Sequence, residues 1–285
     1  MPACYRHPGR ETNVACSSCE RPICPDCMIS TPVGMRCPEC ASERTKVNPV
    51  SFGGFGSGAE PATYVLIGLN VLAFLAELLG GGGAGSLDGG GSLINDGGIN
   101  AYAIEIGGEW WRIVTGGFLH AGPLHLLLNM VALYFLGSLL EPAVGTPRFL
   151  GIYFVSLLAG SCGALVLDPN ALTVGASGAV FGLMSAGFIM ARRRGMEDLA
   201  SQIGLYVVLN LVFTFAVPHI SVGGHVGGLI GGGAAALIVA WFERRRVPNR
   251  LAIELAIMVL LAGLAVVGCL LAAEAGVQDL IVPLG

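Results

Sequence analysis

Seven long apolar runs alternate with short polar segments over the larger part of this chain. They cover about residues 62–79, 124–140, 148–167, 177–191, 199–217, 222–242 and 251–273. Each run is close to the roughly 20 residues that a helix needs to cross the hydrocarbon core of a bilayer. The pattern therefore predicts an all-α membrane protein, a bundle of seven transmembrane helices of which the fourth is short and rich in small residues.

The first 60 residues differ in character and predict a separate domain. Residues 1–45 are polar and contain seven of the nine cysteines. The stretch SFGGFGSGAEP that follows is rich in glycine, serine and proline, which is typical of a flexible linker. We expect a small domain at 1–45, a linker at 46–61 and a membrane domain at 62–285. No secretory signal is expected, since the polar amino terminus has no apolar core.

Composition supports the membrane assignment. Hydrophobic residues make up 54% of the 285 and charged residues 12%, while 44 residues are glycine. These proportions are typical of closely packed membrane helices. The net charge of −4 is small and gives no indication of nucleic acid as a partner.

Lysine and arginine predict the orientation in the membrane. If the amino terminus is cytoplasmic, seven alternating spans place fourteen of the fifteen basic residues inside and leave only Arg112 outside. Cytoplasmic loops carry an excess of basic residues, so this orientation is favoured. We therefore expect a multi-pass protein of the cell (plasma or inner) membrane with a cytoplasmic amino terminus.

Four polar residues lie at a similar depth near the outer ends of three spans. His125 and Asn129 are four apart and share one helix face, Ser177 opens the fourth span, and His225 lies in the first turns of the sixth. Polar groups inside a membrane are costly, so such a cluster indicates a functional site.

Chemistry suggests a role for each member of this cluster. A serine hydroxyl needs a base to become a nucleophile, and histidine is suited to that task near neutral pH. Ser177 is the candidate nucleophile and His225 the candidate base, a pair without the orienting acid of a triad. Asn129, His125 and the backbone N–H of Ser177 are candidate donors to an oxyanion.

Glycines predict that the fourth and sixth spans pack closely. Gly178 and Gly182 are four apart, as are Gly224, Gly228 and Gly232. This small-xxx-small spacing lets two helix backbones touch, which would bring Ser177 to His225. For any single pair, helix packing alone is the simpler reading. GASG also differs from the G-x-S-x-G motif of soluble hydrolases, because residue 179 is alanine.

Over residues 62–285 the chain resembles the rhomboid intramembrane serine proteases. The resemblance rests on motifs in order along the chain: Trp111-Arg112, His120, the HxxxN of His125 and Asn129, Glu141, GASG at 175–178 and GHxxG at 224–228. It implies a Ser177–His225 dyad, with His125, Asn129 and the Ser177 amide as oxyanion donors. It also implies that Glu141 is a buried hydrogen-bonding anchor, that Trp111 and Arg112 are structural, and that the bundle is of the six-plus-one form. Many relatives have tyrosine where this chain has Phe181, which can still stack on the histidine.

The amino-terminal segment carries eight metal-ligating residues in four closely spaced pairs: Cys4 and His7, Cys16 and Cys19, Cys24 and Cys27, Cys37 and Cys40. Two tetrahedral zinc sites need eight ligands. A disulfide framework is disfavoured, because the expected compartment is reducing and one ligand is histidine. The spacing is similar to B-box-type zinc domains, whose pairs interleave, although sequential pairing stays open. A segment this short has too small a core to fold alone, and bound metal would stabilise it. We therefore expect two structural zinc ions and a binding or regulatory role.

The predicted activity is hydrolysis of peptide bonds in or near transmembrane segments of other membrane proteins, with no cofactor needed for catalysis. Expected partners are these substrates, the lipid bilayer and a candidate cytoplasmic protein at the zinc domain. One alternative is a catalytically silent relative that binds and sorts membrane proteins. Another is a transporter or channel, which the scarcity of charged residues in the spans disfavours.

Other polar residues are interpreted without a catalytic role. His120 and His219 are expected at loops or interfaces, and Glu77 and Glu254 at helix ends where a carboxylate reaches water. Asn210 is as easily a contact between helices as a catalytic group.

Overall fold

The computed structural model describes residues 2–31, 34–42, 60–80, 92–218, 220–243, 245 and 247–281. The chain divides into two compact units, Met1–Gly54 and Phe55–Gly285. The linker predicted at 46–61 lies outside the described residues except for Glu60 and Pro61, and so does His219.

The amino-terminal unit is built around thiols rather than hydrocarbon. Its elements are η1 (Pro25–Cys27), β1 (Ile29–Thr31), β2 (Gly34–Arg36) and α1 (Pro38–Ser42). The two strands pair antiparallel, with Ile29 opposite Arg36. Six of the seven residues in its buried cluster are cysteines, and Ile23 is the seventh. So small an apolar core cannot offset the conformational entropy of some 40 residues, so the unit needs another source of stability.

The second unit is a helical bundle. Its elements are α2 (Pro61–Leu79), α3 (Ser92–Gly97), α4 (Ala101–Glu105), α5 (Arg112–Thr115), η2 (Gly116–Phe118), α6 (Pro123–Val144), α7 (Thr146–Leu167), α8 (Ser177–Arg193), α9 (Glu197–Ala216), α10 (Val222–Glu243) and α11 (Arg250–Ile281). Each of the seven predicted spans is a helix within a few residues of its expected bounds, except that α11 continues eight residues further. The all-α prediction is therefore confirmed.

Among the described residues, six helices are long and apolar enough to cross a membrane: α2, α6, α7, α9, α10 and α11. The remaining predicted span is α8, which has only 17 residues. Its interior position compensates for its shortness, since most of its residues from Ala179 to Ala191 are buried against neighbouring helices.

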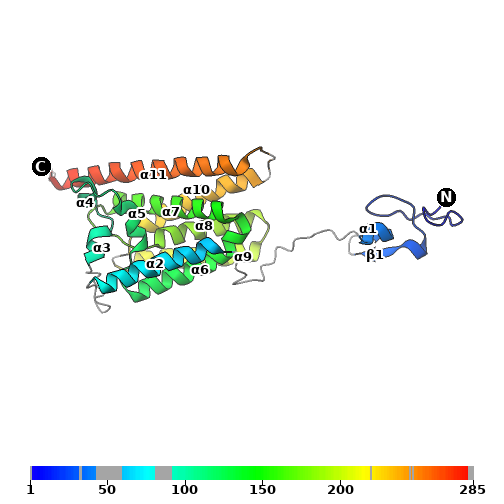
Figure 1. Cartoon of the computed structure of the whole chain (residues 1–285), viewed down its shortest axis with the longest axis horizontal. Coiled ribbons are helices and arrows are strands. Elements are labelled where there is room, and N and C mark those ends of the chain that lie inside the picture. Colours follow the sequence, from blue (N-terminus) through cyan, green and yellow to red (C-terminus); the bar gives the residue numbers. More distant parts are fainter. Residues whose placement is uncertain are drawn as a thin grey trace. The chain divides into compact units, whose positions relative to one another are not determined.

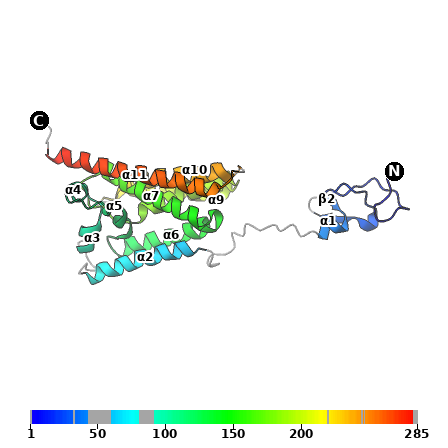
Figure 2. The same cartoon turned by 45° about the horizontal axis from the view of Figure 1, so that its top comes forward.

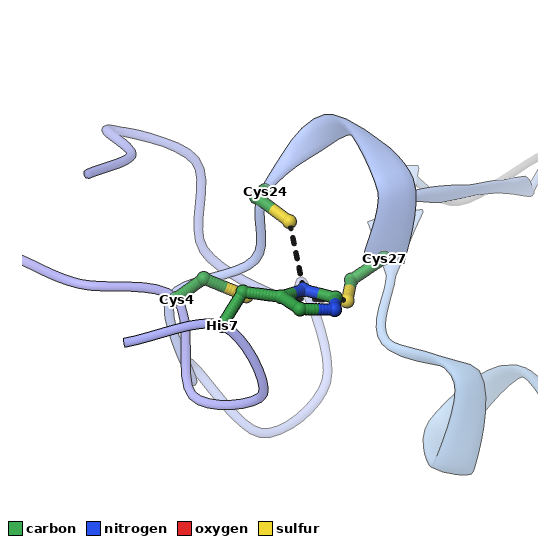
Figure 3. A group of neighbouring side chains, drawn as sticks. All are labelled: Cys4, His7, Cys24 and Cys27. Atoms are coloured by element: carbon green, nitrogen blue, oxygen red, sulfur yellow. Dashed lines mark hydrogen bonds between the residues drawn. The ribbon is translucent and has the colours of Figure 1, made fainter. Parts of the chain in front are cut away.

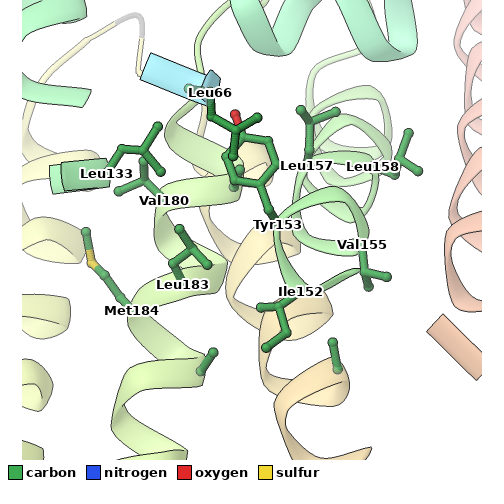
Figure 4. Packing of buried hydrophobic residues seen from close by; sticks show 14 of the residues in the cluster. Leu66, Leu133, Ile152, Tyr153, Val155, Leu157, Leu158, Val180, Leu183 and Met184 are labelled. Carbon is green, nitrogen blue, oxygen red and sulfur yellow. The ribbon is translucent and has the colours of Figure 1, made fainter. Parts of the chain in front are cut away.

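The helices are ordered from a buried centre to an exposed periphery. In α7 and α10, 56% of the most apolar 18-residue window is buried, against 17% in α9 and 11% in α11. In both views α11 runs along one side of the bundle, α2 and α6 lie on the opposite side, and α3 to α5 gather at one end (Figures 1 and 2). Tyr153 and Leu183 lie among the apolar side chains that fill the interior (Figure 4).

Glycines let α10 contact two helices backbone to backbone. A Cβ added at Gly228 would lie 2.0 Å from the carbonyl oxygen of Gly178, which confirms the predicted contact of α8 with α10. A Cβ added at Gly223 would lie equally close to the carbonyl oxygen of Gly163 on α7. The second contact was not predicted, and it makes α7 the third member of the close-packed centre.

Glu141 joins α6 to the start of α2. Its carboxylate is buried and accepts hydrogen bonds from the backbone N–H groups of Ala62 and Thr63, at 3.0 and 2.9 Å, and from the hydroxyls of Thr63 and Thr146. The first N–H groups of a helix have no partner within it, and a carboxylate there also complements the helix dipole. The expected anchoring role is confirmed.

Glu141→Ala should therefore lower the free energy of unfolding by about 3 kcal/mol, because a charged acceptor with four donors is lost. Thermal unfolding in detergent would measure this loss, with exposed Glu105→Ala on α4 as the control. Equal melting temperatures for the two variants would contradict the assigned role.

Two other carboxylates differ from expectation because they are buried rather than close to water. Glu254 is fully buried and forms ion pairs with Arg148 of α7 and, at 2.7 Å, with Arg250. Glu77 is 4% exposed and accepts a hydrogen bond from the backbone N–H of His120 at 3.2 Å. Glu254 thus joins α11 to α7, and Glu77 joins α2 to the loop before α6, so both contacts depend on neighbours that a local pattern does not show.

Candidate active site and metal centres

Ser177 is the first residue of α8 and follows a constrained turn. Gly175 has a φ of +131°, a region that L side chains rarely adopt, and its N–H donates to the carbonyl of Gly116 at 2.8 Å. An antiparallel bridge between Ile99 and Thr173 holds the approach to this turn. Ser177 is half-buried, and its position leaves its backbone N–H without a partner inside the helix.

The start of α6 brings His125 to the same place. A Cβ added at Gly175 would lie 2.8 Å from Cε1 of His125, 2.9 Å from its Nε2 and 3.6 Å from Oγ of Ser177. Gly175 is therefore a common neighbour of the imidazole and of the serine hydroxyl, and a side chain there would clash with the imidazole. Asn129, one turn further along α6, is buried, and its Nδ2 donates to the carbonyl of His125 at 2.9 Å. One N–H of that amide is used in this bond, which leaves the second for another acceptor.

His225 lies in the first turn of α10 and is 8% exposed. Its ring is stacked on that of Phe181, with centroids 4.0 Å apart and an interplanar angle of 17°. Phe181 is one turn beyond Ser177 on α8, so the stack holds the imidazole against the first turn of that helix. Its Nδ1 lies 2.7 Å from Oγ1 of Thr214 on α9. The predicted stacking is confirmed.

A small cavity of about 20 Å³ opens beside Ser177. It is lined by Ser161, Thr173 and Ser221 together with Gly175 and apolar residues such as Leu157. The lining is mostly apolar, and the volume is that of about one water molecule.

His120 lies in the loop before α6, as expected, but it is buried there. It is 1% exposed, and its ring meets the ring of His125 edge to face at a centroid distance of 5.1 Å. The structure thus has His125 and Ser177 as neighbours of Gly175 and His225 stacked on the next turn of α8, and it adds His120 and Thr214 as neighbours of the two histidines. His120 was among the motifs that carry the family resemblance, whereas for Thr214 the only signal was a polar side chain near a span end.

Comparisons with known proteins decide the family. Residues 107–242 match the Rhomboid domain. YdcA of Bacillus subtilis, named as a candidate rhomboid protease, is 33% identical over 153 residues, which are 52% of this chain and 77% of YdcA. The chain belongs to the rhomboid family. As a rhomboid protein with six apolar spans it is a multi-pass membrane protein, and the predicted rhomboid helical bundle is confirmed.

Two further relatives bear on function. Rhomboid protease GluP of Bacillus subtilis is 34% identical over 218 residues, which are 74% of this chain and 42% of GluP. The chain thus spans less than half the length of GluP. Inactive RHOMBOID-like protein 8 of Arabidopsis thaliana is 31% identical over 144 residues, 49% of this chain and 41% of that protein. The chain is thus similar both to a relative named as a protease and to one named as inactive.

In the amino-terminal unit, the eight predicted metal ligands form two groups: Cys4, His7, Cys24 and Cys27, and Cys16, Cys19, Cys37 and Cys40. Within each group the ligand atoms lie within 4.8 Å of one another. This is the interleaved arrangement rather than the sequential one.

The first group has distances that suit a tetrahedral ion. Nδ1 of His7 is 3.3 Å from Sγ of Cys24 and 3.4 Å from Sγ of Cys27, and Sγ of Cys4 is 3.9 Å from Sγ of Cys27 (Figure 3). A tetrahedron with ordinary zinc bond lengths has edges of about 3.5 Å between sulfur and nitrogen and about 3.8 Å between sulfurs. The ligand set fits a metal ion of this kind.

Each group has at least one thiol whose pKa is lowered, which favours the thiolate that binds metal. Burial alone would raise the pKa of the Cys4 thiol, but hydrogen bonds from the backbone at Cys24, Arg6 and His7 outweigh it and lower that pKa to about 6. The Cys16 thiol behaves alike, with a pKa lowered to about 6 despite burial. Backbone N–H groups thus favour negative charge at both clusters.

Proposed function

We propose that this rhomboid protein is an intramembrane serine endopeptidase that hydrolyses peptide bonds in or near transmembrane segments of membrane proteins. The observation that carries the proposal is that the starts of α6 and α10 bring a histidine each to the first turns of α8, which begins at Ser177. The ring of His125 lies against Gly175, which also neighbours the Ser177 hydroxyl, while the ring of His225 is stacked on Phe181, one turn after Ser177 on α8.

The proposed mechanism assigns each group one task. Oγ of Ser177 attacks the substrate carbonyl carbon while Nε2 of His225 takes the hydroxyl proton. The oxyanion accepts hydrogen bonds from the Ser177 N–H, His125 and the remaining N–H of Asn129, and the dipole of α8 favours its charge. His225 then gives its proton to the leaving amine, and a water molecule hydrolyses the acyl-enzyme by the same steps. The small cavity beside Ser177 is a fitting place for that water.

The substrate class follows from where the site lies. Ser177, His125 and His225 are all within one turn of a helix start, so the reaction takes place near one membrane surface. A peptide in a regular helix has its carbonyls in hydrogen bonds, and helix-breaking residues expose them. We therefore propose substrates whose spans are interrupted near the outer surface. We also propose that the enzyme lies in the cell membrane with its amino terminus in the cytoplasm.

The amino-terminal segment, residues 1–45, is proposed as a cytoplasmic domain with two structural zinc ions and a candidate protein partner. Residues 46–61 would link it to the protease domain at 62–285. The ligand groups support zinc, because four thiolate or imidazole ligands at tetrahedral spacing leave no position open for a substrate.

A catalytically silent sorting protein is the alternative, and the similarity to an inactive relative is the observation that favours it. The presence of Ser177, His225, His125 and Asn129 in one site favours the enzyme.

The test compares the wild type with Ser177→Ala and His225→Ala, reconstituted in vesicles with a single-span substrate. We expect each substitution to lower the cleavage rate by at least about a thousandfold, because the nucleophile or its base is removed. Ser201→Ala, an exposed hydroxyl on α9, is the matched control and should cleave at the wild-type rate. Cleavage by folded Ser177→Ala at that rate would overturn the proposal, and a wild type inert toward a panel of spans would favour the sorting protein.

A further inference from the structure

Thr214 is a buried polar residue on a helix that is otherwise mostly exposed. Of the twenty residues of α9, all of them described, three are buried: Ala200, Ile203 and Thr214. Thr214 is 2% exposed and lies two residues before the end of the helix. A buried hydroxyl needs hydrogen-bond partners, so the polar contacts of Thr214 explain its position better than apolar packing does.

Two contacts of the Thr214 hydroxyl determine where its proton lies. Oγ1 is 2.7 Å from the carbonyl oxygen of Asn210, one turn earlier on α9, and 2.7 Å from Nδ1 of His225. A carbonyl oxygen can only accept, so the single hydroxyl proton points to Asn210. The contact with His225 must then be a bond in which Nδ1–H donates to Oγ1.

This proton count assigns the tautomer of His225. With the proton on Nδ1, the lone pair of the neutral ring is on Nε2, and Nε2 is the atom that must accept the proton of the serine. Phe181 fixes the plane of the ring by stacking, and Thr214 fixes which edge carries the proton. Together they leave one orientation and one tautomer, both suited to a general base.

We propose that Thr214 is the positioning residue of the catalytic base and takes the place of the acid that orients histidine in a triad. The inference rests on the proposed protease function and deepens it. A carboxylate would accept the same Nδ1–H but would add a charge within the bundle, which is costly in a membrane. The Thr214 hydroxyl is a neutral acceptor. Because its proton is hydrogen-bonded to a backbone carbonyl, the hydroxyl cannot rotate without losing that bond.

The simpler reading is that Thr214 satisfies its own hydroxyl with the Asn210 carbonyl, as serine and threonine commonly do in helices. In that case loss of the Thr214 hydroxyl would not change the rate of catalysis, so kinetic measurements distinguish the two roles of Thr214. Thr214→Val keeps the shape and removes the oxygen, whereas Thr214→Ser keeps the oxygen and removes a methyl group. Asn210→Ala is the matched control, because it changes a side chain on the same helix and leaves the accepting carbonyl in place.

We expect Thr214→Val to lower kcat by about tenfold to a hundredfold with KM within about twofold, since general-base catalysis typically contributes 10² or more. Thr214→Ser should keep kcat within about threefold of the wild type, and Asn210→Ala should cleave like the wild type. A kcat of Thr214→Val within twofold of wild type would overturn the inference. Equal losses in the valine and serine variants would also overturn it, because they would point to packing of the methyl group.

A second measurement reads the tautomer directly and does not depend on cleavage. Nitrogen-15 NMR of histidine-labelled, full-length Ser177→Ala protein in detergent should show His225 protonated at Nδ1 and unprotonated at Nε2, with the signal identified by its loss in His225→Ala. Adding Thr214→Val should mix the two tautomers. A proton on Nε2, or an unchanged spectrum in the valine variant, would overturn the inference. If the wild type never cleaved, the proposed function would fail while this measurement still decided the role of Thr214.

Discussion

Gly228→Ala is expected to separate α8 from α10 and to lower the free energy of unfolding by about 3 kcal/mol or more. The added Cβ would lie 2.0 Å from the carbonyl oxygen of Gly178 and 2.7 Å from its carbonyl carbon. These are backbone atoms, so no side chain can rotate away and a helix must move. Gly178 follows Ser177 directly, so the displacement reaches the nucleophile, and a misplacement of about 1 Å can reduce catalysis about a hundredfold.

Gly233→Ala is the matched control on the same helix. Its added Cβ has its nearest neighbours at 3.6 Å, which is ordinary van der Waals contact, so stability and cleavage should stay close to wild type. Thermal unfolding in detergent and cleavage in vesicles would measure both variants. If Gly228→Ala had the same melting temperature as Gly233→Ala, α8 and α10 would not be as close as the structure has them.

Removal of metal should unfold the amino-terminal unit and leave the membrane helices folded. A structural zinc ion contributes roughly 10–16 kcal/mol in small zinc domains, which far exceeds what a core of cysteines and Ile23 provides. Elemental analysis of the full chain should find two zinc ions. A strong chelator should remove both and abolish amide protection in residues 2–42, as measured by hydrogen exchange.

Double variants test which ligands share an ion. Cys4→Ser with Cys24→Ser removes two ligands from one interleaved site, so one of two ions should be lost. Sequential pairing would put these cysteines in different sites, and both ions would be lost. Cys162→Ser and Cys269→Ser, in the membrane helices, are the controls and should retain two ions. A wild type without metal would contradict the proposed zinc domain.

The sequence determined the membrane helices and the chemistry of both sites. A bilayer requires long apolar segments with internally satisfied backbones, so seven helices could be placed within a few residues except at the end of α11, and Gly145, with φ +86°, coincides with the end of α6. Ser177 and His225 could be selected because polar side chains among apolar ones are costly. The cysteine pairs indicated metal because their short spacing is imposed by the ligand geometry itself.

Tertiary structure decided everything that depends on how the helices are rotated and which neighbours they have. The hydroxyl of Thr214 meets His225, the carboxylate of Glu254 meets Arg148, and α7 as well as α8 packs on the glycines of α10. In helices that are apolar on nearly every side, the periodicity does not tell which face is turned inward. These contacts arise from packing between segments far apart in the chain, and so does the grouping of eight ligands into two sets. A local sequence pattern does not contain that information.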